Sequence, residues 1–365
     1  MRTWKLVGFE IKQQVKNPIL LTITAIFLIF VYSEFSIYLI HYPVKNQQDI
    51  EAISSSGRHA YLYVERDTSE AKKVLQDSFD NLSVEDFGGN STDYRLVRKW
   101  IDTEYNNSMT MDEVLESFTR QVNSPRLRDF MNKRIQRATE KIGTPEQINN
   151  NILQELKGNS FAEKISMIYA DRTQVVASLL AIPLFAFLFA KDRRYQMSEL
   201  IRIKPIDAFR YVTSRYMGCF IVYISMIAGI GMILNIWLCI NLHRGGWEID
   251  VITIFKDIIV YILPSLLFIT MFIILIYLLS SNELVTVPIC LIYIIYNITM
   301  KAFTGTHDND INWFQYIIRN DDGLSLPLDW SIISHRLLYL VLFFVLLVLS
   351  CGVWKTNKTQ FWNRE

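Results

Sequence analysis

Long apolar runs separated by blocks of charged residues constrain this chain more than any other feature of its sequence. Six predominantly apolar stretches lie at residues 19–40, 173–190, 216–241, 254–280, 284–300 and 332–354. About 20 apolar residues, rising roughly 1.5 Å each, carry a helix across the hydrocarbon core of a bilayer. The pattern therefore predicts an all-α polytopic membrane protein with six transmembrane helices. No small-residue cleavage site follows the first run, so it is expected to be an uncleaved span.

The distribution of lysine and arginine predicts the topology, because these residues favour short cytoplasmic loops. Basic residues are concentrated in the N-terminal segment, in residues 191–215 and in the C-terminal tail, whereas 242–253 and 301–331 carry few. Six spans with both termini in the cytoplasm satisfy all of these loops together. Frequent Asn, Ile and Lys give the chain a bacterial appearance. We therefore expect a multi-pass protein of the bacterial cytoplasmic membrane.

This topology divides the chain into three parts. Residues 1–42 form a cytoplasmic N-terminal helix and the first span, residues 43–172 form a large extracellular insertion, and residues 173–365 hold the other five spans and the cytoplasmic tail. The insertion is predicted to be mainly helical because apolar residues recur three or four apart in "SEAKKVLQDSF", "MDEVLESFTRQV" and "EQINNNILQELKGNSFAEKISMIYA". Glycine, proline and asparagine predict breaks at 87–93, 123–126 and 142–147.

Residues 191–215 form a basic segment between two apolar runs. Within it an apolar stripe at three-residue spacing predicts a helical path with basic residues between; its members are Leu200, Ile203, Ile206, Phe209 and Val212. Pro205 disfavours helix at Lys204 and suits the first turn of a following helix. We expect a short helix near 195–203, a bend, and a second helix that continues into the third span. A solvated basic loop with an interfacial apolar face is the ordinary alternative.

Six spans, the N-terminal helix "TWKLVGFEIKQQVKNP" and the segment "SELIRIKPIDAFRYVTSRYMG" together resemble an ABC-2 type permease, the membrane subunit of a bacterial ABC exporter. The resemblance implies that Glu199, Pro205 and Arg215 match an acidic residue, a proline and a basic residue of the coupling element of that family. Family members often have Thr-x-Pro where this chain has Ile203-Lys204-Pro205. The predicted contacts to an ATPase partner are Glu199, Leu200, Ile203, Pro205, Arg210 and Arg215.

The resemblance further implies a separate ATP-binding ABC subunit and a second permease copy as partners, within membrane lipid and without nucleic acid. No G-x-x-x-x-G-K-[ST] loop occurs, so ATP and Mg are expected in the partner and no cofactor in this chain. The predicted function is export of an amphipathic or hydrophobic substrate, such as a peptide, lipid or drug-like molecule. No catalytic or metal site is expected, because the five histidines are scattered without ligand spacing.

Two alternative functions and two local questions stay open at the level of sequence. The chain could be a membrane-tethered sensor or assembly protein whose external region binds a peptide or envelope component. A secondary transporter is disfavoured, because no paired buried charges or inverted repeat are visible in the spans. Glu34 is either interfacial or a buried intramembrane carboxylate. The aromatic segment 310–321 is expected to form an amphipathic interfacial helix.

Overall fold

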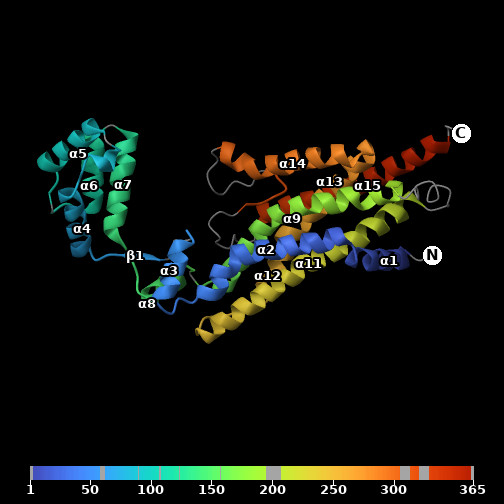
Figure 1. The fold of residues 1–365 in the computed structure, drawn as a ribbon, viewed down its shortest axis with the longest axis horizontal. Helices are drawn as coiled ribbons and strands as arrows, with labels where there is room; N and C mark the ends of the chain where they lie inside the picture. The colour runs from blue at the N-terminus through green and yellow to red at the C-terminus, as the bar shows by residue number, and fades with distance from the viewer. Residues whose placement is uncertain are drawn as a thin grey trace. The chain divides into compact units, whose positions relative to one another are not determined.

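A computed structural model describes residues 3–57, 62–88, 90–106, 108–122, 124–156, 158–194, 207–304, 313–319 and 329–362. These parts of the chain are mostly helical and form two compact units (Figure 1). Unit 1 comprises Met1–Ile40 with Gly158–Glu365, and unit 2 comprises His41–Lys157. The prediction of a predominantly helical polytopic protein is confirmed.

Unit 1 is a bundle of long helices. Its elements are α1 (Thr3–Val15), α2 (Pro18–His41), α9 (Phe161–Arg194), α11 (Ala208–Arg244), α12 (Thr253–Asp257), the π-helical turn η2 (Ile258–Ile262), α13 (Leu263–Ser280), α14 (Glu283–Thr304) and α15 (Trp330–Trp362). In the described parts of the chain, five apolar helices are long enough to cross a membrane: Pro18–His41, Phe161–Ala190, Ala208–Arg244, Thr253–Ser280 and Trp330–Thr356. The predicted fifth span, 284–300, corresponds to the shorter apolar helix Glu283–Thr299 and stays a prediction.

α9 and α13 form the centre of this bundle. In the most apolar window of Phe161–Ala190 and of Thr253–Ser280, 67% and 72% of residues are buried, against 28–39% in the other three spans. α13 packs against α9, α14 and α15, and α11 packs against α1, α9 and α15. The spans α2, α11 and α15 therefore keep one apolar side exposed, which suits lipid or another membrane protein.

Local sequence explains where these helices begin, end and change geometry. The Asn282 side chain accepts a hydrogen bond from the Leu284 N–H at the start of α14, as its cap position predicts. The η2 turn ends two residues before Pro264. Proline lacks the backbone N–H that an α-helix needs, and a π turn can absorb that mismatch. α9 and α14 continue through their own prolines, Pro183 and Pro288, without such a turn.

Unit 2 contains a four-helix core and a small sheet. The core helices are α4 (Thr68–Asp80), α5 (Ser91–Thr103), α6 (Met111–Gln121) and α7 (Pro125–Thr139), with the 3₁₀ turn η1 (Glu85–Phe87). The helices α3 (Gln47–Ser55) and α8 (Pro145–Glu155) lie at the two ends of the unit in the sequence. Strands β1 (Tyr63–Glu65) and β2 (Glu140–Ile142) pair antiparallel, with Val64 opposite Lys141. Phe79, Trp100 and Phe118 form the aromatic centre of the core between α4 and α7.

The predicted breaks in this region fall at helix boundaries. Gly88 takes a left-handed conformation with φ 64° at the end of η1, and Asn90 caps α5. Pro125 is the first residue of α7, and Thr144 caps α8. The last helical stretch expected from sequence is divided, because α8 ends at Glu155 and Gly158 has φ 92° before α9 begins. The extracellular placement of this unit stays a prediction.

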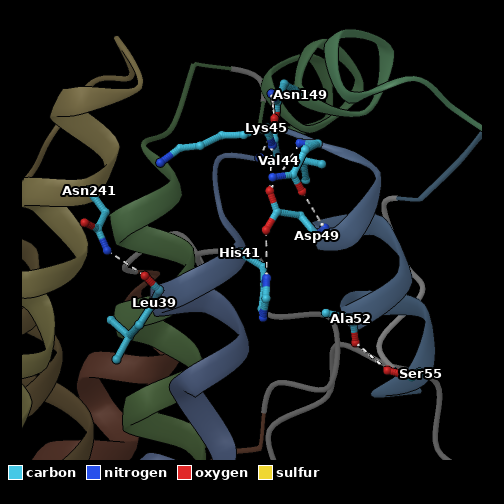
Figure 2. Close-up of polar contacts among 10 residues, drawn as sticks. Leu39, His41, Val44, Lys45, Asp49, Ala52, Ser55, Asn149 and Asn241 are labelled. Carbon is cyan, nitrogen blue, oxygen red and sulfur yellow. Dashed lines mark hydrogen bonds and ion pairs between the residues drawn. The ribbon is translucent and has the colours of Figure 1, made fainter.

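Hydrogen bonds also secure the first residues of unit 2 (Figure 2). Asp49 accepts from the backbone N–H groups of Lys45 and Asn46, and its Oδ1 lies 2.8 Å from Nδ1 of His41. Asn149 bonds both backbone groups of Val44. Burial alone would raise the pKa of Asp49, but the bonds from His41 and from the two backbone N–H groups hold it below its ordinary value. The segment that leads out of α2 is thus held in one conformation.

Candidate functional site

Two polar sites in unit 1 stand out against its apolar helices. The first lies where α9 ends and α11 begins. Phe189 of α9 and Trp354 of α15 both contact the ring of Tyr211, with centroids 6.0 and 5.0 Å apart. α1 packs against α11 in the same region. The structure therefore brings together parts of the three segments in which the sequence concentrates lysine and arginine: the N-terminal helix α1, the start of α11 and the end of α15.

Arg215 joins these helices. Its Nη1 lies 3.1 Å from Oε2 of Glu10 on α1, and its Nη2 donates to the Leu188 carbonyl of α9 at 3.4 Å. The two charged side chains are only 14% and 5% exposed. Removing one partner of such a buried pair leaves an uncompensated charge, so the pair strongly favours this helix arrangement over alternatives in which the partners separate.

α1 presents its polar side to the protein. Gln14 donates to Glu10 at 2.7 Å, and Asn17 donates to Gln14 at 2.9 Å, while Trp4 and Phe9 are exposed. Exposed aromatic residues with an inward polar side are typical of a helix that lies in the membrane interface. The Glu10–Gln14–Asn17 chain therefore turns α1 toward α11 and gives the carboxylate of Glu10 a fixed orientation.

Gly218 lets α1 approach α11 closely. A Cβ atom added there would lie 2.5 Å from Cβ of Glu10 and 2.7 Å from its Cγ. Such distances are well below van der Waals contact, so any side chain at this position would push the helices apart. The glycine is therefore required for the ion pair between Glu10 and Arg215.

The predicted coupling residues separate into two groups. Glu199, Leu200, Ile203 and Pro205 lie outside the described residues. Arg210 is exposed in the first turn of α11, whereas Arg215 points into the bundle. The predicted helix that leads into the third span begins at Ala208. The contact of these residues with an ATPase partner stays a prediction.

The second site is a polar cluster buried among α9, α13, α15 and residues 313–319, which we call the Arg336 cluster. Arg336 Nη1 donates to Oγ of Ser265 at 2.8 Å and to the Tyr316 carbonyl at 3.0 Å. Its Nη2 donates to Oε1 of Gln174 at 3.1 Å. The guanidinium also lies 5.5 Å from the ring centroid of Tyr261. These contacts connect three helices and a non-helical segment through one cation.

Residues 313–319 are not the interfacial helix that the sequence predicts for 310–321. They lack helical structure, and Tyr316, Ile317 and Ile318 are buried. Asn297 accepts from the Tyr316 N–H, and the Gln315 carbonyl lies 2.9 Å from Nε2 of His335. Non-helical backbone can occur at membrane depth only where protein supplies its hydrogen-bond partners. Of the aromatic residues that suggested an interface, Tyr316 is buried in the bundle, whereas Trp313 and Phe314 are exposed.

An ion pair holds the end of this segment. Arg319 Nε lies 3.0 Å from Oδ1 of Asp171 on α9, and the Asp171 side chain is 3% exposed. Glu34, which the sequence left as either buried or interfacial, is half-buried and lies 3.8 Å from Nε of Arg172. Its placement in the membrane interface stays a prediction.

Sequence reasoning passed over Arg336, Gln174, Asp171 and Glu10. A signal was present for Arg336, because it is the one Asp, Glu, Lys or Arg residue in "IISHRLLYLVLFFVLLVLSCGVW". A charge inside an apolar span is costly and by itself suggests a function. Gln174 and Glu10 carried no such signal, since Gln174 stands at the edge of the predicted span 173–190 and Glu10 lies in a polar N-terminal segment.

In the described parts of the chain no group of three or more His, Cys, Asp or Glu side chains could hold a metal ion. The four cysteines are free thiols in apolar surroundings. The Arg336 cluster places a positive charge in an apolar bundle, and the contacts of Arg215 link α1, α9 and α11.

Comparison with known proteins gave one result. A family model described as "ABC-2 family transporter protein" matches residues 29–319, which is more than half of the chain. No curated protein and no solved structure matched. The matched range includes unit 2, Arg215 and most of the Arg336 cluster, but it ends before α15 and begins after α1.

Proposed function

The chain belongs to the ABC-2 transporter family, and from this premise we propose that it is the permease subunit of an ABC exporter, driven by a separate ATP-binding subunit. The membrane-spanning helices of unit 1 would form the path or surface for the substrate. ATP and Mg would be bound by the partner, because this chain has no phosphate-binding loop.

The observation that carries the proposal is the Arg215 joint. Residues 195–206, which contain four of the six predicted contacts with the ATPase, connect the end of α9 to the start of α11. Arg215 bonds to the last turns of α9 from within α11 and also holds Glu10 of α1. A push on the connecting residues would therefore act on three helices as one body. Rigid-body movement of packed elements is a common form of conformational switching in proteins.

Arg210 and Arg215 would then have different tasks. The exposed side chain of Arg210 is free to meet an acidic surface on the ATPase, while the inward Arg215 transmits the displacement. Closure of the partner around ATP would favour one arrangement of the bundle over another, which is how a ligand shifts a conformational equilibrium. The exposed apolar sides of α2, α11 and α15 would face lipid or a second permease copy.

The test is coupled ATPase activity. The chain is coexpressed with the ATPase encoded beside its gene, the two are purified together, and ATP hydrolysis is compared between wild type and variants in lipid nanodiscs. Glu199→Lys and Pro205→Ala are expected to reduce permease-dependent hydrolysis at least about tenfold, or about 1.4 kcal/mol. Arg120→Ala, on an exposed surface of unit 2, serves as the control.

Two results would contradict the proposal. Full coupled ATPase activity in both variants would mean that residues 195–206 do not couple this chain to the ATPase. Failure of the chain to associate with any ATP-binding subunit, combined with capture of an extracellular peptide by unit 2, would instead support a sensor. Unit 2 has a hydrophobic core of its own, so such binding can be measured directly.

A further inference from the structure

Arg336 is a buried cation in a membrane-spanning helix. It lies six residues into α15, or about 9 Å along the helix axis from Trp330, and it is 4% exposed. A charged side chain inside an apolar bundle is unfavourable unless an opposite charge compensates it. The partners of Arg336 therefore decide what the cluster is for.

All of its observed hydrogen-bond partners are neutral. They are the hydroxyl of Ser265, the backbone carbonyl of Tyr316 and the amide oxygen of Gln174. Within the described ranges, no carboxylate lies within the 4.0 Å ion-pair distance of its guanidinium. Three neutral acceptors could be satisfied equally well by a neutral donor, so these contacts do not account for a positive charge.

Two buried carboxylates of this bundle are already engaged elsewhere. Asp171 pairs with Arg319, and Asp257 accepts a hydrogen bond from Ser166 at 2.6 Å. The positive charge of the Arg336 cluster is thus not balanced by a side chain in the described parts of unit 1.

The cluster also holds unused donors. Nε of Arg336 and Nε2 of Gln315 are buried and have no hydrogen-bond partner in the described structure. Buried donors without a partner are costly and uncommon. Gln315 and Arg336 belong to the same cluster, since the Gln315 carbonyl contacts His335 and the next carbonyl accepts from Arg336. An uncompensated cation with spare N–H groups is suited to an anion.

We propose that the Arg336 cluster is the anion-binding part of the substrate site and takes the carboxylate or phosphate group of an amphipathic molecule. This inference rests on the proposed exporter function. The guanidinium supplies the charge and Nε, and Gln315 adds a neutral donor. Residues 313–319 are held in place by hydrogen bonds and not by helical structure. The ligand enters when this segment separates from α15. The apolar residues around the cluster receive the chain of the amphiphile.

The experiment measures anion preference without ATP or partner. Purified full-length chain in phosphatidylcholine nanodiscs is titrated with dodecanoate at pH 8 and with the neutral analogue dodecanol, by calorimetry with empty nanodiscs subtracted. A charge-assisted hydrogen bond corresponds to about 10- to 100-fold in affinity. Wild type is expected to bind dodecanoate at least about tenfold more tightly than dodecanol, and Arg336→Gln to lose that preference.

Matched variants separate charge recognition from folding. Arg336→Lys keeps the cation and is expected to retain the preference within about threefold, whereas Gln315→Leu is expected to reduce it about three- to tenfold. Arg172→Gln is the control, because it removes a half-exposed arginine that already faces Glu34 and Asp171. If Arg336→Gln does not fold, the Gln315→Leu result decides.

The proposal is overturned if wild type does not prefer dodecanoate, or if a folded Arg336→Gln or Gln315→Leu variant keeps the full preference. Adding phosphatidylglycerol to the nanodiscs distinguishes the anion source. Competition with dodecanoate supports a lipid headgroup, and no competition supports a soluble amphiphile, both at the same site. Because binding is measured without the ATPase, absence of permease-dependent ATP hydrolysis in the wild type, with intact dodecanoate binding, would contradict the exporter proposal and leave this site standing.

Discussion

Replacing Gly218 by alanine should separate α1 from α11. The new Cβ would lie 2.5 Å from Cβ of Glu10 and 3.3 Å from the Val7 carbonyl. The Cβ of Glu10 is fixed to the helix backbone, so a change of side-chain rotamer cannot relieve the clash. α1 must move outward, and the 3.1 Å contact between Glu10 and Arg215 lengthens with it.

Gly229, on the same helix, provides the matched control. A Cβ there would meet nothing within 4 Å. Alanine in place of glycine stabilises a helix by about 0.8–1 kcal/mol, a gain common to both positions. At Gly218 overpacking costs about 1–3 kcal/mol, and weakening the buried ion pair adds part of the roughly 3–5 kcal/mol that its loss would cost. We expect Gly218→Ala to destabilise by about 2 kcal/mol and Gly229→Ala to stabilise slightly.

The assay is SDS-induced unfolding in mixed micelles, followed by circular dichroism. Gly218→Ala should unfold at a lower SDS fraction than wild type, and Gly229→Ala at the same or a higher one. The opposite signs matter more than the magnitudes, because both variants make the same chemical change. If Gly218→Ala is as stable as Gly229→Ala, α1 does not pack against α11 as described.

Three further predictions concern other contacts. Glu10→Ala or Arg215→Ala alone should cost about 3–5 kcal/mol and the double variant less than their sum, so additive losses in the same SDS assay would refute the pair. Trp100→Ala should cost unit 2 about 3–5 kcal/mol, accelerating hydrogen exchange in α4–α7 but not in α9 or α13; uniform acceleration would contradict two separate cores. Asp86 accepts a hydrogen bond from the backbone N–H of Ser83 and lies beside Arg134. These two interactions outweigh burial and hold the pKa of Asp86 below its ordinary 3.8. Its stabilisation is therefore present above about pH 4 and lost as pH falls through the lowered pKa; hydrogen exchange of unit 2 at pH 6 and pH 3 should show this loss in wild type but not in Asp86→Asn.

Features that depend on a few neighbouring residues were predictable. The capping pairs Thr110 with Glu113 and Thr144 with Gln147 are read directly from their three-residue spacing, and the structure forms both. The apolar runs predicted membrane helices, because length and hydropathy alone decide whether a helix can cross a bilayer. The family resemblance rested on the same local information, together with the order of the segments.

Contacts between distant segments required the tertiary structure. Arg215 finds Glu10 across 205 residues, and Arg336 finds Gln174 across 162. In a soluble protein the polar side of a helix would indicate which face turns outward. In a membrane helix the face toward lipid and the face toward the protein are both apolar, so the pattern does not distinguish them. The sequence by itself determined which long apolar segments are helical and able to enter the membrane; only the tertiary structure decided that 313–319 is not helical and which polar side chains meet inside the bundle.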